Sequence, residues 1–291
     1  MKVGCFMTKK RRIIIVTVLL IIAILGCLLV YENKNIELNT FEIMSEDLPA
    51  EFDGYCIAHI SDFHNAKFGK DNAKLINMLK EAEPDIIAIT GDIIDSRRTD
   101  INVSLDFVEE ILKIAPCYYV TGNHEARVSE EYTLLKEKMA QAGVIILEND
   151  CLSIERKDAF IEVIGLQDPT FSVIGTTAEE AEVVSDVLPK LTTSDDNFTI
   201  LLSHKPEFFD IYVENDIDLV LSGHAHGGQF RIPFIGGIIA PGQGLFPELD
   251  SGFFEKDGTK MIVSRGIGNS IIPLRINNRP EIILIDLHSA G

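Results

Sequence analysis

The side chains best suited to chemistry in this sequence include two histidines that directly follow an apolar run within residues 216–229. The run, residues 217–221, shows little periodicity, which is typical of a strand buried on both faces. Beyond it come Gly223, His224 and His226. Because alternate side chains of an extended segment point the same way, the two imidazoles can converge on one transition metal ion. An H-x-H pair alone is weak evidence, since about as many such pairs are unrelated surface or core histidines as are metal ligands.

Four other apolar runs end in the same way, with side chains of the types that bind metals. The runs are residues 55–60, 85–90, 117–121 and 198–203, and they are followed by Asp62 and His64, by Asp92, by Asn123, His124 and Glu125, and by His204. Each set falls at the carboxyl end of an expected strand, which is where ligands bind in open α/β sheets. Five of the seven histidines lie at these five strand ends, whereas we expect His59 and His288 to be hydrogen-bonded or exposed. The repetition favours one metal site built from several strand ends.

The pattern from about residue 36 to residue 287 indicates one α/β unit. Helical periodicity occurs in residues 70–83, 101–114, 129–142 and 178–188, between the expected strands. Such alternation is typical of the α/β class. The later segments 151–156 with 159–164, 252–255 with 260–264, and 281–287 resemble antiparallel strands, so we expect them to form a second, mixed sheet. About 250 residues without a repeat or a linker are enough for one large core.

The N-terminal segment predicts a membrane anchor. Residues 1–12 are basic, and residues 13–31 contain no charge and are long enough, at about 1.5 Å per residue, to cross a hydrocarbon core of about 30 Å. We expect the basic segment to be cytoplasmic and the chain beyond a short tether and first strand, residues 32–50, to be extracytoplasmic, in a single-pass protein of the cell membrane. A cleaved signal peptide, a lipoprotein site at Cys27 and a twin-arginine signal at Arg11 and Arg12 are alternatives that match the sequence poorly.

The rest of the chain is strongly acidic. Residues 1–12 contain five of the 26 Lys and Arg residues and no acid, so the remainder has 21 basic against 45 acidic residues, a net charge of −24. Such a domain does not attract nucleic acid by its general field, and an anionic substrate must be captured locally. Arg265 and Arg275 are candidates by position, although each is equally consistent with an ion-paired or solvated arginine. The five cysteines include no C-x-x-C pair, which argues against a zinc ribbon.

The strand-end motifs together resemble those of the calcineurin-like metallophosphoesterase superfamily. In sequence order they are D-x-H at 62–64, G-D at 91–92, G-N-H-E at 122–125, the histidine at 204 and G-H-A-H-G-G-Q at 223–229. Residues 263–282 are similar to the membrane-associated bacterial branch of that superfamily. The resemblance implies that residues 51–291 form the metallophosphoesterase domain. It also implies an α/β fold of four layers, an α/β/β/α sandwich of two mixed sheets, with the site at the carboxyl ends of the central strands.

The resemblance also implies a role for each residue of the motifs. Asp62, His64, Asp92 and His226 would hold one metal ion, and Asp92, Asn123, His204 and His224 a second, so that Asp92 bridges the two. Such oxygen and nitrogen ligands suit Mn, Fe, Zn or Co. Two divalent cations about 3.5–4 Å apart can share a hydroxide that attacks phosphorus. His124 would protonate the leaving oxygen as general acid, and Glu125 would either orient His124 or be a rim carboxylate.

The expected activity is hydrolysis of a phosphodiester or pyrophosphate bond. Because the tether is short, and because related membrane-associated members act on lipid or envelope intermediates, including UDP-diacylglucosamine-type molecules, we expect a lipid-linked or cell-envelope substrate. Apolar residues between 229 and 263, including Phe234 and Phe246, would contact its acyl part unless this segment folds over the domain's own core. The alternatives are a phosphomonoesterase or protein phosphatase with the same site, and a non-catalytic metal-bound binding protein. The sequence does not indicate an oligomeric state.

Overall fold

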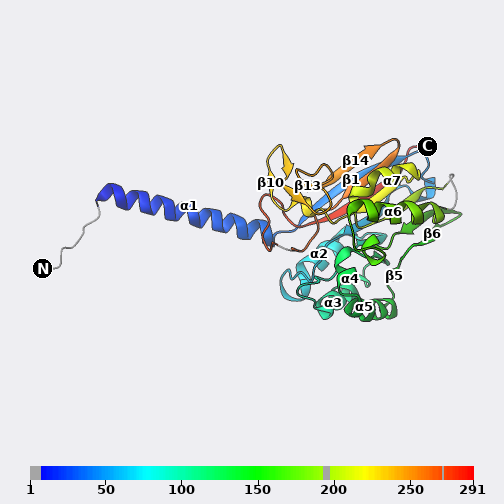
Figure 1. Ribbon diagram of the computed structural model, residues 1–291, viewed down its shortest axis with the longest axis horizontal. Helices are drawn as coiled ribbons and strands as arrows, with labels where there is room; N and C mark the ends of the chain where they lie inside the picture. Colours follow the sequence, from blue (N-terminus) through cyan, green and yellow to red (C-terminus); the bar gives the residue numbers. More distant parts are fainter. Residues whose placement is uncertain (1–7, 193–196, 271) are drawn as a thin grey trace.

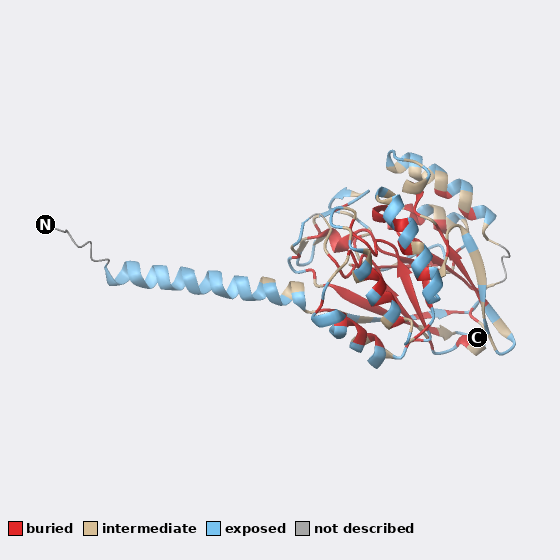
Figure 2. Cartoon of the chain, turned by 90° about the horizontal axis from the view of Figure 1, so that it is seen from below, coloured by how far each residue is buried: buried red, intermediate tan, exposed pale blue. Residues whose placement is uncertain are grey.

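A helix of 26 residues, α1 (Lys9–Lys34), projects from the rest of the molecule (Figure 1). The computed structural model describes residues 8–192, 197–270 and 272–291. Within these residues α1 is the one helix long and apolar enough to cross a membrane, with a mean hydropathy of 3.4 over an 18-residue window. None of that window is buried against the domain (Figure 2). A helix that is apolar all round and is not buried against any of the described residues suits a lipid environment.

Polar contacts fix the end of α1 to the domain. The side-chain amide of Asn33 donates to the backbone oxygen of Arg275 (2.9 Å) and accepts from the backbone nitrogen of Arg275 (2.8 Å). The guanidinium of Arg279 lies 5.4 Å from the ring centre of Tyr31. Strand β1 (Glu37–Ser45) begins almost immediately after α1 ends. The domain is therefore held close to the end of the apolar helix.

Two six-stranded sheets form the centre of the domain. Their orders are β1-β16-β2-β3-β4-β5 and β14-β15-β9-β8-β7-β6. The strands after β1 are β2 (Tyr55–Ile60), β3 (Ile86–Thr90), β4 (Cys117–Val120), β5 (Ile145–Ile146), β6 (Asp150–Arg156), β7 (Ala159–Gly165), β8 (Thr199–Leu202), β9 (Leu219–Ser222), β14 (Gly252–Lys256), β15 (Thr259–Val263) and β16 (Glu281–Ser289). The pairs β2–β3 and β8–β9 are parallel, whereas β16–β2, β6–β7 and β14–β15 are antiparallel, so both sheets are mixed.

Three hydrophobic cores join four layers of secondary structure. Helices α2 (Ala73–Ala82), α3 (Ile101–Ile111) and α5 (Ser129–Ala142) cover the outer face of the first sheet, and α6 (Thr177–Val187) and α7 (Phe209–Glu214) cover that of the second (Figure 1). Leu75 and Leu79, one helical turn apart on α2, belong to the first of these cores. Ile57 and Leu202 meet in the core between the sheets, and Tyr212 belongs to the third. This confirms the α/β/β/α sandwich that the resemblance implies.

The prediction that residues 281–287 belong to the second sheet is wrong. Strand β16 lies in the first sheet, between β1 and β2. Its successive side chains point into two different cores, with Ile282 under the helices and Ile283 between the sheets. A strand with apolar residues on both faces fits either sheet equally well, so the sequence does not distinguish the two. The sequence pattern also does not predict α7 or α4 (Asn123–Arg127), because helices this short show no periodicity.

Between β9 and β14 the chain forms two small hairpins. They pair β10 (Arg231–Ile232) with β11 (Gly236–Gly237), and β12 (Ile239–Ala240) with β13 (Gly244–Leu245). The backbone nitrogen of Arg231 donates to the backbone oxygen of Ile276 (3.0 Å), next to the residue that binds Asn33. The first hairpin is thereby placed near the end of α1 (Figure 1).

Candidate metal centre

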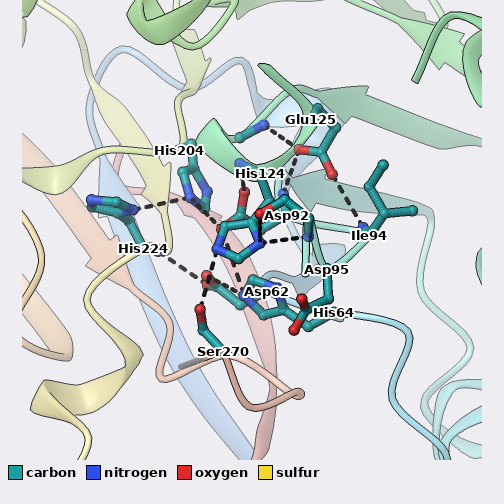
Figure 3. Close-up of polar contacts among 12 residues, drawn as sticks. Asp62, His64, Asp92, Ile94, Asp95, His124, Glu125, His204, His224 and Ser270 are labelled. Carbon is teal, nitrogen blue, oxygen red and sulfur yellow. Dashed lines mark hydrogen bonds and ion pairs between the residues drawn. The ribbon is translucent and has the colours of Figure 1, made fainter. Parts of the chain in front are cut away.

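Seven buried side chains from five strand ends meet at one edge of the two sheets. Figure 3 shows Asp62, His64, Asp92, His204 and His224 among them. They follow β2, β3, β4, β8 and β9 and are Asp62, His64, Asp92, Asn123, His204, His224 and His226. Because β2, β3 and β4 are parallel, as are β8 and β9, and the two sheets pack face to face, these carboxyl ends lie together. The structure thus brings together all of the residues that we predict as ligands.

The backbone at these strand ends adopts a conformation that aims the side chains inward. Five of the seven residues have φ between 46° and 65°, namely Asp62, His64, Asp92, His224 and His226. Non-glycine residues rarely adopt this left-handed region, which costs about 1–3 kcal/mol per residue and is found mostly where function needs it. Gly91, with φ of 82°, lets the ends of β3 and β4 touch, since a Cβ there would lie 2.6 Å from the backbone nitrogen of Gly122.

One group of potential ligands contains Asp62, His64, Asp92 and His226, whose ligand atoms all lie within 4.8 Å of one another. Nε2 of His226 lies 3.3 Å from Oδ1 of Asp62 and 3.2 Å from Nε2 of His64. Nε2 of His64 lies 3.5 Å from Oδ2 of Asp92. Two ligand atoms that each lie about 2.1 Å from one ion are themselves about 3–3.5 Å apart. The spacing therefore suits one cation among these side chains.

A second group contains Asp92, His204 and His224, with Asn123 beside it. Nε2 of His204 lies 3.3 Å from Oδ2 of Asp92 and 3.2 Å from Nδ1 of His224. The amide oxygen of Asn123 faces Nδ1 of His224, and the amide nitrogen faces the guanidinium of Arg127. The reverse amide orientation would form hydrogen bonds to both neighbours. A cation held between the oxygen and the imidazole would stabilise the orientation that the structure has.

The two groups together fit two divalent cations that share Asp92. Oδ1 of Asp62 is buried and has no hydrogen-bond partner among the described residues, so it is available to a cation. The potential ligands are carboxylates, imidazoles and an amide, without a thiolate. This donor set agrees with the expected pair of metals and suits Mn, Fe, Zn or Co.

Burial and mutual attraction set the charges of the centre. Burial opposes ionisation of Asp92, but the imidazoles of His204 and His124 outweigh it and hold its pKa well below the usual range. Burial lowers the pKa of His204, but the carboxylate of Asp92 outweighs this effect and raises the pKa to about 10. His224 keeps a pKa well below its usual value because of burial and the neighbouring His204. A cation that binds here would therefore displace a proton from His204, since metals bind neutral imidazole.

His124 lies at the rim of the centre with a defined ring orientation. Its Nδ1 accepts from the backbone nitrogen of Ser96 (3.0 Å), so the neutral ring carries its proton on Nε2. Nε2 lies 3.2 Å from Oγ of Ser270 and 3.9 Å from Oδ2 of Asp92. Burial lowers the pKa of His124 to about 4, although Asp92 opposes this. The ring thus directs an N–H at the space next to the metal centre.

The expected contact between Glu125 and the His124 ring is not formed. Oε2 of Glu125 accepts from the backbone nitrogens of Gly122 (2.7 Å) and Asp92 (2.9 Å), and Oε1 accepts from that of Ile94 (3.1 Å). The reason is α4, in which Glu125 is the third residue and reaches back to the helix start. Glu125 is also fully buried and is not a rim carboxylate. It holds the chain after β3 against the end of β4.

Asp95 also lies at the candidate site, although no motif in the sequence predicts it. It is buried, and its carboxylate lies with His64 and His124 in a third group whose ligand atoms are within 4.8 Å of one another. Oδ1 of Asp95 accepts from the backbone nitrogen of Arg97 (2.8 Å). Its spacing of three residues from Asp92, after the same strand, is the signal that could have identified it.

The two arginines considered for anion capture are structural. Arg265 pairs with Glu37 and Glu281, with both distances at 2.6 Å. Arg275 is buried, and its Nη1 donates to the backbone oxygen of Arg265 (2.7 Å). Their guanidinium groups are therefore engaged inside the protein, and the ion-paired alternative holds for Arg265.

Comparison with known proteins identifies the family. Residues 56–228 match the calcineurin-like phosphoesterase family, and this segment contains all seven predicted ligands. The Bacillus subtilis protein described as uncharacterized metallophosphoesterase YkuE is 32% identical over 269 residues, which cover 89% of this chain and 88% of that protein.

Two further relatives are described in terms of activity and location. Phosphodiesterase YaeI of Escherichia coli is 27% identical over 236 residues, which cover 79% of this chain and 81% of that protein. A Danio rerio transmembrane protein with metallophosphoesterase domain is 28% identical over 257 residues, which cover 86% of this chain and 56% of that protein. From its match, its fold and its clustered ligands, this chain belongs to the calcineurin-like phosphoesterase family and is a metal-dependent phosphoesterase.

Proposed function

We propose that this enzyme hydrolyses a phosphodiester or pyrophosphate bond of a lipid-linked or cell-envelope substrate. The observation that carries the proposal is a pair of cavities, one against each half of the metal centre. A cavity of about 410 Å³ reaches His64, and another of about 310 Å³ reaches Asn123 and His224. A phosphodiester has a substituent on each side of its phosphorus, whereas a monoester has one. Two cavities therefore favour the diester, which is also the substrate class in the name of the relative YaeI.

The proposed metal ligands are those expected from the sequence, with Asp62, His64, Asp92 and His226 around one cation and Asp92, Asn123, His204 and His224 around the other. Bound divalent cations would supply positive charge to the phosphate and lower the pKa of a water molecule. We assign the general-acid role to the protonated form of the His124 ring, which would give its Nε2 proton to the leaving oxygen and become neutral. In the neutral ring, the backbone N–H of Ser96 donates to Nδ1 and leaves the proton on Nε2, and Glu125 keeps the end of β3 in register with the end of β4.

The proposed lipid character of the substrate rests on exposed apolar residues of the two hairpins, the first of which lies near the end of α1. Phe234 and Ile235, at the tip of the β10–β11 hairpin, are exposed, as are Leu245 and Phe246 near the second hairpin. These side chains do not fold over the domain's own core, so that alternative is wrong for them. Exposed apolar side chains that gather on one surface can bind apolar partners. An acyl chain against these hairpins would place its phosphate near the metal centre.

The proposed location is the outer face of the cell membrane. Lys9, Lys10, Arg11 and Arg12 begin α1, and basic residues flanking a membrane span stay in the cytoplasm. The domain follows the other end of α1 and would therefore lie outside. A substrate from the cell envelope would be accessible there.

The test compares a detergent-dispersed lipid phosphodiester with a soluble aryl diester. The variant Phe234→Ser with Phe246→Ser should lower turnover of the lipid several-fold and leave the soluble ester unaffected. Phe160→Ser, at a phenylalanine of β7 that is 41% exposed, serves as the matched control. Equal lipid turnover by the variant and the parent protein would exclude the hairpins from substrate binding.

A further inference from the structure

The cavity beside His64 extends to the end of the apolar helix. Asn33 and Lys34 of α1 line the same cavity as His64 and Asn65, and the segment Ile267–Asn269 lines another side. Its volume of about 410 Å³ is in the range of small-molecule binding sites. One end of this cavity thus lies at the metal centre, and the other lies at the point where α1 leaves the domain.

The charge of this cavity is opposite to that of the domain. It is lined by three basic residues, Lys34, Lys67 and Arg98, and by one acidic residue, Asp100. Residues 13–291 as a whole have 21 basic and 45 acidic residues, a net charge of −24. Arg98 pairs with Asp95 at 3.4 Å, but its side chain remains 64% exposed. Within the part of the chain that the structure describes, no ion pair involves Lys34 or Lys67. Lys34 and Lys67 therefore offer positive charge, which no ion pair among the described residues neutralises, to an anion that the rest of the domain repels.

Lys34 lies at the end of α1, just beyond the stretch that could cross a bilayer. The uncharged stretch of α1 ends at Tyr31, and Lys34 lies about one helical turn beyond it. The two hydrogen bonds between Asn33 and Arg275 fix this turn to the domain. If α1 spans the membrane, Lys34 lies at the level where lipid phosphates are found. Ile272 and Ile276, both partly exposed beside this junction, add apolar surface on the same side.

We propose that this cavity binds the anionic phosphate headgroup of a membrane lipid, with Lys34, Lys67 and Arg98 as its specificity-determining residues. The inference rests on the proposed function, and it narrows the substrate to lipids that carry an anionic group besides the phosphate that is cleaved. That second group would occupy the basic cavity while the scissile phosphate occupies the metal centre. Selectivity then comes from the cavity, since the metal centre recognises any phosphate.

The test measures binding without turnover. The full chain in detergent is stripped of metal with a chelator, and dihexanoyl phosphatidate, dihexanoyl phosphatidylcholine and sn-glycerol 3-phosphate are titrated by calorimetry. A charge pair contributes about 1 kcal/mol even in water, which is about fivefold in affinity. We therefore expect Lys67→Ala with Arg98→Ala to weaken phosphatidate binding at least tenfold. Lys70→Ala with Lys80→Ala, at a different cavity, is the matched control and should bind as the parent protein does.

Each other outcome has a defined meaning. Unchanged phosphatidate binding by the Lys67 and Arg98 variant, or equal binding of phosphatidylcholine by the parent protein, would overturn the proposal. Glycerol 3-phosphate binding as tightly as phosphatidate would assign the cavity to free phosphate compounds and overturn the lipid source. Because no hydrolysis is measured, a loss of binding in the variant supports this cavity even if the loaded enzyme fails to cleave lipids. That failure would contradict the proposed function alone.

Discussion

Asp92 is in contact with both halves of the metal centre. Its Oδ2 lies 3.5 Å from Nε2 of His64 and 3.3 Å from Nε2 of His204, and its Oδ1 accepts from the backbone nitrogen of His124 (2.8 Å). Three strand ends therefore depend on one carboxylate for both charge and position. A change at Asp92 should affect both cations at once, whereas a change at a terminal ligand should affect mainly one.

We predict that Asp92→Ala abolishes turnover and lowers the metal content to less than two ions per chain. The variant would lose the proposed shared ligand of both cations, and it would leave several imidazoles without their carboxylate. Metal analysis of the purified protein is the measurement, and Asp106→Ala, an exposed aspartate of α3, is the control. Two ions per chain with near-normal rates would show that Asp92 is not a bridging ligand.

A second prediction concerns His124 and the leaving group. If Nε2 of His124 donates the proton, its loss should slow substrates with an alkoxide leaving group by roughly 10²–10⁴-fold. An aryl leaving group such as nitrophenolate needs little protonation. His124→Ala should therefore spare nitrophenyl esters relative to alkyl esters in paired rate measurements. An equal loss on both would assign His124 a positioning role.

The clustering of the candidate ligands could be predicted from the sequence, because each of them lies just after a recognisable apolar run. Glu125 and Asp95 could not be placed in this way. Glu125 turns toward the backbone nitrogens of Asp92 and Ile94 because α4 begins at Asn123, and a helix of five residues has no readable pattern. Asp95 approaches His124 through the fold of the loop after β3, which no local pattern specifies.

At the scale of elements, parallel strands in two sheets bring ligands from distant parts of the chain to one edge. The predicted ranges agree closely with β2 and α5, because an apolar run that ends at metal-type side chains and helical periodicity over 14 residues are distinctive. The membership of β16 could not be predicted, since a strand between two cores has apolar residues on both faces whichever sheet it joins. Packing between the two sheets decides such assignments, and packing is not visible in a local pattern.

Away from the site, a titratable side chain connects the start of β8 to the start of β9. Oδ2 of Asp218 accepts from the backbone nitrogen of Thr199 (2.7 Å), just before β9. Burial raises the pKa of Asp218 from 3.8 to about 6, although this hydrogen bond opposes it. The folded state thus binds this proton more tightly than the unfolded state, so the stability it contributes is present below about pH 4 and is lost as pH rises through 6.

We therefore predict that Asp218→Asn raises the melting temperature relative to the parent protein more at pH 7.5 than at pH 4.5. The neutral amide keeps an acceptor for Thr199 and removes the cost of a half-buried charge. Thermal unfolding of both proteins in detergent at the two pH values is the measurement. The same difference in melting temperature at both values would show that Asp218 does not titrate as the structure indicates.

At the scale of the whole molecule, α1 and the β10–β11 hairpin lie at the same end of the domain (Figure 1). The contacts of Asn33 and Arg231 with the segment around Arg275 connect them. A membrane that contains α1 would therefore lie close to Phe234. Strand β6 lies at the end of the domain away from α1, and Phe160 of β7 pairs with Glu155 of β6.

The sequence contains no tryptophan, so a single tryptophan can report this geometry. We predict that Phe234→Trp, in the full chain reconstituted in phosphatidylcholine nanodiscs, is quenched by lipids brominated on their acyl chains. Phe160→Trp should not be quenched. Both positions are exposed, so neither substitution should disturb a core. Equal quenching at the two positions, or none at position 234, would show that the hairpin does not lie at the membrane.

The most direct test of the account is the rate of the metal-stripped and metal-reloaded full chain on paired aryl phosphate mono- and diesters. We predict no turnover after chelation, recovery on addition of Mn²⁺, and a higher kcat/KM for the diester than for the monoester, because the clustered side chains would hold divalent cations between two cavities. Turnover that persists after the metal has been removed would contradict the metal-dependent mechanism. A clear preference for the monoester would contradict the phosphodiesterase assignment.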